Sequence, residues 1–277
     1  MIDLGFVQGR LCDQVDGQIQ AFPWDDWRSE FEIASEIGFS KIEWTLDFIG
    51  LDENPLLTAG GRDEIKYLSQ KFNVEVVSVT GDCFMQAPFW KASDSIFRDK
   101  LLNDLFAIVE ACSSLGVRKI VVPLVDNGSI TNARQEKLLI KEFRSINGFL
   151  IENNVKILFE TDFSPIKTKK FIKNFPVESF GINYDTGNSA ALGFSPSLEF
   201  SLFHYYIHNI HLKDRLLHGG TVPLGEGHVD FKLVFENLKK FNYNKNLILQ
   251  TARASDGNHV AAILQFRDFI LDIWKKT

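Results

Sequence analysis

Four apolar runs in the second half of the chain end in side chains that can bind a metal ion. The end residues are Glu160, Asp185, His211 and Gln250. Two carboxylates, an imidazole and an amide oxygen make a mixed oxygen and nitrogen ligand set. Such a set suits Mn²⁺, Mg²⁺, Co²⁺ or Zn²⁺ with positions left for water. The fourth residue stands apart, because a glutamine offers an oxygen without a charge and cannot take up a proton.

Each of these residues also has an ordinary explanation when it is considered alone. Glu160 fits an exposed or helix-capping carboxylate, Asp185 before "TGN" fits a turn, and His211 fits a buried core histidine. On consecutive strands, however, the four side chains can converge on one point. We therefore expect a divalent cation held by Glu160, Asp185, His211 and Gln250.

Positive side chains follow the same strand ends. Arg10, Arg215 and Arg253 come just after predicted strands, and Lys213 and Arg215 begin the loop "KDRLLHGGTVPLGEGHVDF". Its glycines give this loop unusual backbone freedom, which fits either a long connection or a segment that covers a substrate. The guanidinium groups fit either surface ion pairs or a phosphate or carboxylate on the substrate. We expect the three arginines to contact an anionic substrate.

The histidines limit the kind of metal site. All six lie in the last third of the chain, which excludes a multinuclear zinc site built from histidines around a whole barrel. His208 comes three residues before His211, and on a strand the two side chains point to opposite faces. We expect His208 to be structural.

The elements that must position these residues alternate along the chain. Eight short apolar runs predict strands, and amphipathic segments between them predict helices. This order predicts an α/β protein with parallel strands. The length of the chain and the number of strands fit a single (β/α)8 TIM barrel domain over 1–277. A doubly wound sheet is the alternative, and it is less favoured because no glycine-rich dinucleotide fingerprint follows the first strand. The expected strands are 2–7, 41–46, 74–79, 119–125, 155–161, 179–185, 207–212 and 246–252, and the expected helices include 24–39, 96–116, 133–154 and 231–242.

Composition narrows the possible partners. The net charge of −6 argues against a general nucleic-acid binder. No apolar run is long enough for a membrane span, no signal peptide is evident, and the three cysteines form neither a disulfide framework nor a zinc motif. We expect a cytoplasmic protein that acts on a small molecule without nucleic acid or membrane, and a homo-oligomer is compatible with the sequence.

Several segments resemble one known family. They are "ILFET", "NYDTGNSAALG", "HNIHLKDR", "VPLGEGHVDF" and "LILQTAR", with "GFVQGRL", "IQAFPW" and "IGFSKIEW" near the start. Nearly the whole chain resembles the xylose-isomerase-like TIM barrels of the sugar phosphate isomerase/epimerase superfamily, and its opening is similar to a branch found among bacterial surface-sugar genes. The resemblance implies a divalent metal held by Glu160, Asp185 and His211. Gln250 stands where the family commonly has a glutamate, and Asn188 where it often has a histidine.

The resemblance implies a metal-dependent isomerase or epimerase of a sugar, sugar phosphate or sugar acid. Epimerases of this family are thought to move a proton beside a carbonyl with two glutamates on opposite faces of the substrate. Gln250 cannot do this, so Glu160 is expected to be the only metal-bound base, with Lys213, Glu43, water or no group as its partner. We also expect Glu43 and Asn188 to contact the substrate.

Three other activities are compatible with such a barrel. A lyase or dehydratase would begin with the same proton removal. A catalytically altered barrel would only bind a sugar-like ligand, which Gln250 and Asn188 would explain. The branch of the superfamily that cuts DNA is disfavoured by the acidic pI of about 5.6.

Overall fold

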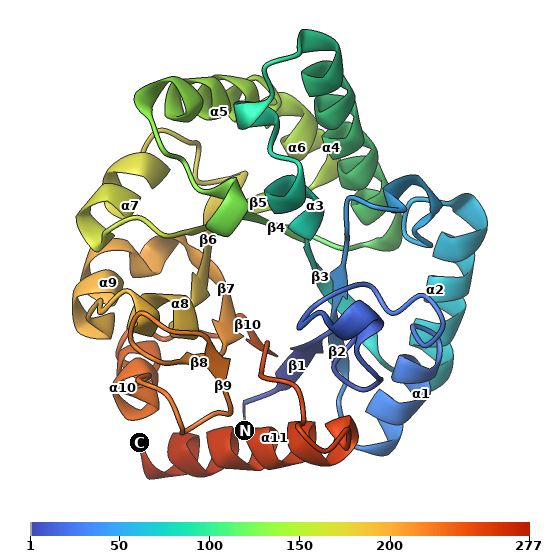
Figure 1. The fold of residues 1–277 in the computed structure, drawn as a ribbon, viewed down its shortest axis with the longest axis vertical. Coiled ribbons are helices and arrows are strands. Elements are labelled where there is room, and N and C mark those ends of the chain that lie inside the picture. The colour runs from blue at the N-terminus through green and yellow to red at the C-terminus, as the bar shows by residue number, and fades with distance from the viewer. Residues whose placement is uncertain (1) are drawn as a thin grey trace.

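Eight parallel strands form a closed barrel at the centre of the computed structural model, which describes residues 2–277 (Figure 1). Around the barrel the strands follow the order β1, β10, β7, β6, β5, β4, β3, β2. The single TIM barrel predicted from the sequence is therefore confirmed. The barrel strands are β1 (Leu4–Val7), β2 (Lys41–Thr45), β3 (Glu75–Thr80), β4 (Lys119–Leu124), β5 (Lys156–Thr161), β6 (Phe180–Asp185), β7 (Ile207–Leu212) and β10 (Asn246–Leu249).

Helices form a ring outside the strands (Figure 1). Five short 3-10 helices lie in the connections, at Val15–Gly17, Leu51–Glu53, Phe89–Lys91, Asp126–Gly128 and His204–Tyr206. The α-helices are α1 (Ser29–Glu36), α2 (Ala59–Phe72), α3 (Asp82–Gln86), α4 (Ser95–Leu115), α5 (Ala133–Ser145), α6 (Asn147–Asn153), α7 (Pro165–Ile172), α8 (Thr186–Ala191), α9 (Pro196–Phe203), α10 (Phe231–Lys240) and α11 (His259–Lys276).

Most predicted elements differ from the observed ones by one or two residues at their boundaries, and three differ more. The helix expected over 24–39 is only α1, because the residues after Pro23 form turns. The helix expected over 133–154 divides into α5 and α6 at Ile146, where Asn147 and Gly148 are poor helix formers. The last strand ends at Leu249, since the carbonyl of Thr251 accepts a hydrogen bond from Arg10 instead.

The outer faces of the strands carry much of the aromatic core. The Phe159 ring lies 4.9–5.9 Å, centroid to centroid, from four other phenylalanine rings on β6, α5, α7 and the segment after α7. Burial of both strand faces explains the nearly continuous apolar runs in the sequence.

Polar side chains occupy the middle of the barrel interior. Glu43, Ser78, Asn183 and Asn209 are at most 2% exposed and are joined by hydrogen bonds. This polar layer lies next to the strand ends inside the barrel, so it restricts the side chains that point into the barrel at those ends.

A two-stranded antiparallel hairpin follows the seventh barrel strand, formed by β8 (Asp214–Arg215) and β9 (Thr221–Val222). It belongs to the glycine-rich loop noted in the sequence. Among residues 2–277, no helix combines the length and apolar character needed to cross a membrane.

Candidate functional site

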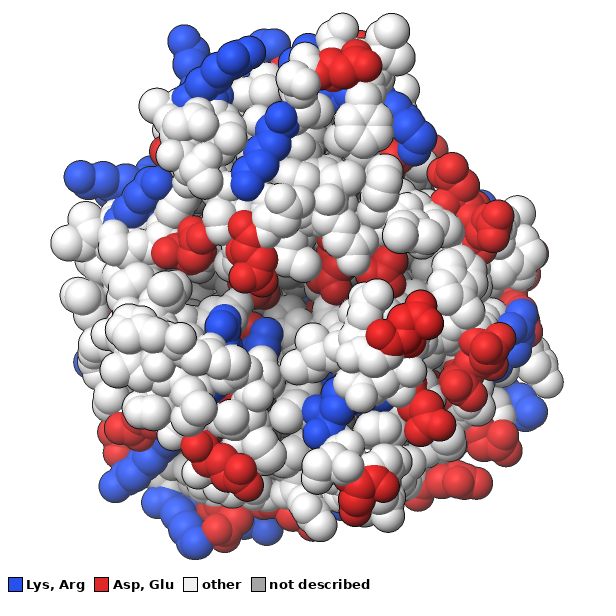
Figure 2. Space-filling view, viewed as in Figure 1, with Lys and Arg blue, Asp and Glu red and all other residues white. Residues whose placement is uncertain are grey.

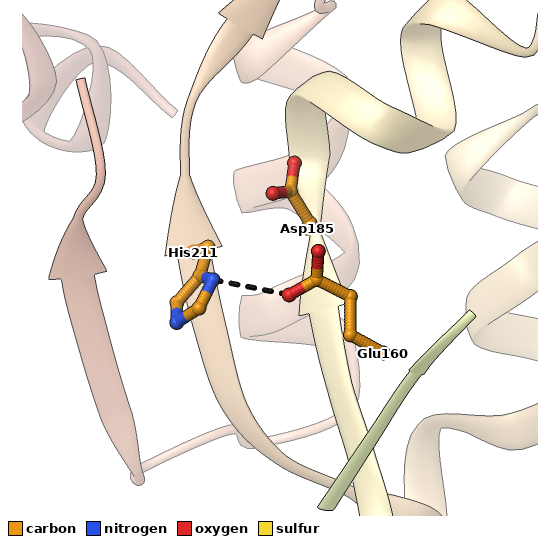
Figure 3. Close-up of side chains that lie close together, drawn as sticks. All are labelled: Glu160, Asp185 and His211. Atoms are coloured by element: carbon orange, nitrogen blue, oxygen red, sulfur yellow. Dashed lines mark ion pairs between the residues drawn. The ribbon is translucent and has the colours of Figure 1, made fainter. Parts of the chain in front are cut away.

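Three of the predicted ligands converge at the ends of neighbouring strands (Figure 3). Glu160 on β5, Asp185 at the end of β6 and His211 on β7 each offer a ligand atom, and these atoms lie within 4.8 Å of one another. All three side chains are buried. Parallel strands in register produce this convergence, since Asp185 and His211 are paired residues of β6 and β7.

The two nitrogens of His211 face different carboxylates. Nδ1 lies 3.2 Å from Glu160 Oε2, and Nε2 lies 2.6 Å from Glu43 Oε1. Metal-binding histidines commonly donate their second ring N–H to a carboxylate, which fixes the tautomer and the ring plane. Glu43 is fully buried beside the ring, so the structure places it behind the histidine.

The pKa values of this pair reflect their contact. Burial alone would lower the pKa of His211, but Glu43 and Glu160 raise it to about 10. Burial alone would raise the pKa of Glu43, but His211, Ser78 and Asn209 together lower it. A metal ion at Nδ1 would require this nitrogen without its proton, so cation binding at this site is expected to release a proton.

Two asparagines orient the carboxylate of Glu160. Asn183 donates to its Oε2 at 2.6 Å, and Asn188 donates to its Oε1 at 2.7 Å. The backbone N–H of Asn188 donates to Asp185 Oδ1, which places Asp185 at the N-cap of α8. Asn188 therefore contacts both metal-ligand candidates that carry a carboxylate.

Gln250, which comes directly after β10, is hydrogen-bonded to Lys213. Its Oε1 accepts a hydrogen bond from Lys213 Nζ at 3.1 Å, and the same ammonium lies 3.3 Å from Asp185 Oδ2. Lys213 thus places a positive charge beside Gln250, where the resemblance implies that related proteins commonly have a carboxylate. The donor atoms of Glu160, Asp185 and His211 fit a divalent ion with open positions, and Gln250 as the fourth ligand stays a proposal.

A hydrogen-bonded chain leads from Gln250 to a further carboxylate. Gln250 Nε2 donates to Gln20 Oε1 at 2.9 Å, and Gln20 Nε2 donates to Asp82 Oδ2 at 2.5 Å. Burial, followed by the charge of Asp47, raises the pKa of Asp82 to about 7. Asp82 can therefore exchange a proton near neutral pH.

One cavity of about 440 Å³ is lined by Glu160, Lys213, Gln250, Gln20 and Asp82. Figure 2 shows a hollow in the middle of this face, bordered by acidic and basic side chains. Gly220 and Thr221 of the glycine-rich loop also line the cavity. Its charged and amide lining residues are Arg10, Gln18, Gln20, Asp82, Gln86, Asp126, Glu160, Asn188, Lys213, Arg215 and Gln250.

The three predicted arginines lie in different places. Arg10 and Arg215 line the cavity, and Nη1 of Arg10 is buried without a hydrogen-bond partner among residues 2–277. Arg215 donates to Asn188 Oδ1 at 2.8 Å and to the carbonyl of Gly219. Arg253 lines a separate surface cavity and donates to the carbonyls of Gly9 and Cys12. Its position supports the loop after β1 and gives no support to a contact with substrate.

No role was predicted from the sequence for Asp82 and Gln20, which connect to Gln250 through hydrogen bonds. Asp82 follows the third strand, and its position at a strand end was the available signal. Gln20 lies in the irregular segment after β1, where no periodic pattern marks it. Only the fold reveals that Gln20 links Asp82 to Gln250.

Comparison with known proteins gives a family match. Residues 31–269 match the family model described as "Xylose isomerase-like TIM barrel". The chain is 24% identical over 258 residues to "Putative L-ribulose-5-phosphate 3-epimerase SgbU" of Escherichia coli (strain K12), covering 88% of this chain and 90% of that protein.

Two solved structures share the fold. D-psicose 3-epimerase with D-tagatose from Clostridium cellulolyticum H10 gives a TM-score of 0.74 at 12% identity, and 99% of each chain is covered. The IOLI protein with a bound zinc atom gives a TM-score of 0.76 at 14% identity, with 99% of each chain covered. The likeness to a surface-sugar branch stays a prediction.

Proposed function

The chain belongs to the xylose isomerase-like TIM barrel family, and from this premise we propose that it is a metal-dependent epimerase or isomerase of an anionic ketose. The observation that carries the proposal is that Glu160, which belongs to the buried cluster with Asp185 and His211, lines one cavity together with Asp82. Two acid–base groups in one cavity favour epimerisation, which removes a proton from one face of a carbon and returns one to the other. Relatives named as 3-epimerases support the same reaction class.

We assign Glu160 as the base. Its carboxylate is oriented by Asn183 and Asn188, so it can remove a proton from the carbon beside the ketose carbonyl. A divalent ion held by Glu160, Asp185 and His211 would supply positive charge to the carbonyl oxygen during this proton transfer.

Asp82 is the proposed second acid–base group. Gln250 cannot exchange a proton in place of a glutamate, whereas Asp82, two hydrogen bonds away, has a pKa of about 7. In this scheme Asp82 delivers a proton to the face of the carbon away from Glu160. Lys213, predicted to be catalytic, places its ammonium beside Asp185 and Gln250, where it stabilises negative charge that develops on the substrate oxygen.

The substrate is proposed to carry a phosphate or carboxylate. The unpartnered Nη1 of Arg10 and the charge of Arg215 both lie at the cavity, and guanidinium groups bind such anions well. Arg10→Gln should raise KM for L-ribulose 5-phosphate much more than for unphosphorylated L-ribulose. Equal changes in the two KM values would contradict an anion contact at Arg10.

The reaction class is tested by solvent deuterium exchange and by product stereochemistry. Purified protein with Mn²⁺ is incubated in D₂O with L-ribulose 5-phosphate, L-ribulose, D-psicose and D-tagatose in turn. The wild type should introduce deuterium and invert the carbon next to the carbonyl of one of these ketoses. Glu160→Gln should abolish exchange, whereas Asp82→Asn should retain exchange but lose inversion.

Asp126→Asn is the matched control, because Asp126 is an exposed carboxylate on the same cavity and has the positive φ of 50° that asparagine tolerates. It should keep both exchange and inversion. Unchanged exchange in Glu160→Gln would disprove the role of Glu160 as the base. Normal inversion in Asp82→Asn would disprove the role of Asp82 and leave that of Glu160 standing.

A further inference from the structure

The opposite end of the barrel gathers positive charge without ion-pair partners. Lys119 and Lys156 are the first residues of β4 and β5 and are paired in register, and Lys245 comes just before β10. Within residues 2–277, none of these three ammonium groups lies within 4.0 Å of a carboxylate oxygen. Lys41, at the start of β2, differs because it pairs with Asp3 at 2.8 Å.

Backbone carbonyls satisfy only part of this charge. Lys156 Nζ donates to the carbonyl of Glu178 at 2.7 Å, and Lys245 Nζ donates to the carbonyl of Ile207 at 2.7 Å. Lys119 makes no hydrogen bond from its ammonium to another described residue. Carbonyl dipoles solvate an ammonium but leave its full charge, so the cluster keeps a net attraction for an anion.

The burial of these lysines and their closeness to one another lower their pKa values. Burial lowers the pKa of Lys119 to about 8, and the charges of Lys245 and Lys41 act in the same direction. Burial and then Lys245 lower the pKa of Lys156 to about 8. Glu43 and Glu75 oppose the shift at Lys119 but do not cancel it. Each cation is thus less stable here than in water, and a bound anion would reverse this penalty.

A cavity of about 330 Å³ lies beside these lysines. Lys119, Lys156, Ser179 and His208 line it, with the exposed Arg118 at its edge. Ser179 is only 1% exposed, and its hydroxyl has no hydrogen-bond partner among the described residues. Burial and three neighbouring lysines lower the pKa of His208 to about 3, so its ring is neutral and still carries one N–H donor. Two cations and two neutral donors therefore meet at one cavity.

We propose that this cavity at the N-terminal end of the barrel binds the phosphoryl group of a small metabolite, with Lys119 and Lys156 as its cationic contacts. A phosphoryl group carries up to two charges and three acceptor oxygens, which matches two ammonium groups with hydroxyl and imidazole donors better than a carboxylate does. Among the described residues, Glu178 is the one carboxylate that also lines the cavity, and its side chain is exposed. The site is separate from the cavity that contains Glu160 and does not rest on the proposed reaction.

Site-resolved lysine labelling tests the proposal on the unmodified protein. An amine-acetylating reagent is applied at pH 8 in inorganic phosphate, in acetate or in chloride of equal ionic strength, and acetylation is measured by peptide mass spectrometry. Phosphate should slow labelling of Lys119 and Lys156 by about fivefold or more at saturation. Lys41, which is ion-paired, and Lys66, which is exposed on α2, should label at the same rate in all three salts.

A pair of variants gives an independent measurement. Phosphate should raise the thermal unfolding midpoint of the wild type and of Lys41→Gln equally. It should raise that of Lys119→Gln clearly less, because Lys119 lines the cavity and Lys41 does not. Absence of selective protection at Lys119 and Lys156 would overturn the proposal. Equal protection by acetate would also overturn it, since the site would then show no preference for a phosphoryl group.

Discussion

At the scale of single residues, the neutral amide of Gln250 has a charged hydrogen-bond partner in Lys213. The ammonium of Lys213 lies between Gln250 Oε1 and Asp185 Oδ2, so a positive charge lies between a neutral amide and a carboxylate. A carboxylate at position 250 would pair with Lys213 and reduce the field available to an anionic substrate. Under the proposed function, Gln250 favours an anionic substrate and leaves proton transfer to another group.

The buried contact between Glu43 and His211 gives a prediction about metal affinity. Glu43→Gln keeps the shape of the side chain but removes the charge that holds the His211 ring, so Mn²⁺ affinity should fall by about 10- to 100-fold. Isothermal titration of the metal-free protein measures this change. The control is Glu75→Gln, an exposed glutamate at the start of β3, which should bind Mn²⁺ like the wild type.

The proposed role of Asp82 predicts the pH dependence of inversion. Asp82 must be protonated to deliver its proton, and its pKa of about 7 means that the protonated fraction falls as pH rises through neutrality. The inversion rate should therefore decrease by about tenfold per pH unit well above pH 7, while exchange promoted by Glu160 persists. The ratio of inversion to exchange, measured from pH 5.5 to 9, reports this. A ratio independent of pH would argue against Asp82 as the donor.

At the scale of elements, the glycine-rich loop after β7 is held by a buried carboxylate. Asp214 is 0% exposed and accepts hydrogen bonds from the backbone N–H groups of Gly225, Gly227 and Val229. A Cβ at Gly227 would lie 2.1 Å from Asp214 Oδ1, so only glycine allows this approach. The hydrogen bonds to Asp214 therefore hold in place the loop that borders the cavity through Gly220 and Thr221.

Glycine substitutions test this anchor. Gly227→Ala should displace the carboxylate of Asp214, increase proteolytic cleavage within 216–229 and raise KM, because the cavity wall loses its support. Gly220→Ala is the matched control, since a Cβ there would meet no heavy atom within 4 Å. Equal cleavage of the two variants would show that Asp214 does not hold the loop.

At the scale of the whole molecule, phenylalanine side chains packed between the barrel and its helices hold the strands in place. Phe159 comes directly before Glu160 on β5, so its ring points outward to the helices while the carboxylate points to the cavity. Its ring is fully buried among four others. The packing of Phe159 and the position of Glu160 are thus coupled through one strand.

This packing predicts a large stability loss from one substitution. Phe159→Ala should lower the free energy of unfolding by about 3–5 kcal/mol, because it removes a fully buried ring and leaves a cavity. Phe97→Ala, at a ring that is 41% exposed on α4, should cost about 1 kcal/mol or less. Chemical denaturation of both variants measures the difference, and similar losses would contradict the central place of Phe159 in the core.

Much of the fold and the central ligand cluster followed from local patterns in the sequence. Apolar runs and amphipathic segments alternate eight times, and parallel strands bring their carboxyl ends to one side of a barrel. Glu160, Asp185 and His211 are each the chemically distinctive residue at or near such an end, so their meeting could be predicted. Family membership was predictable for the same reason, since its motifs are short segments around these ends.

Only the tertiary structure determined which side chains contact one another. Glu43 and His211 are 168 positions apart, and Gln20 and Gln250 are 230 apart, so no local pattern records either pair. Arg253 illustrates the same limit, because it follows a strand end but turns to the loop after β1. Strand periodicity fixes which residues reach an edge of the barrel. The rotamers and distant neighbours that determine which atoms face the cavity arise only when the chain is packed.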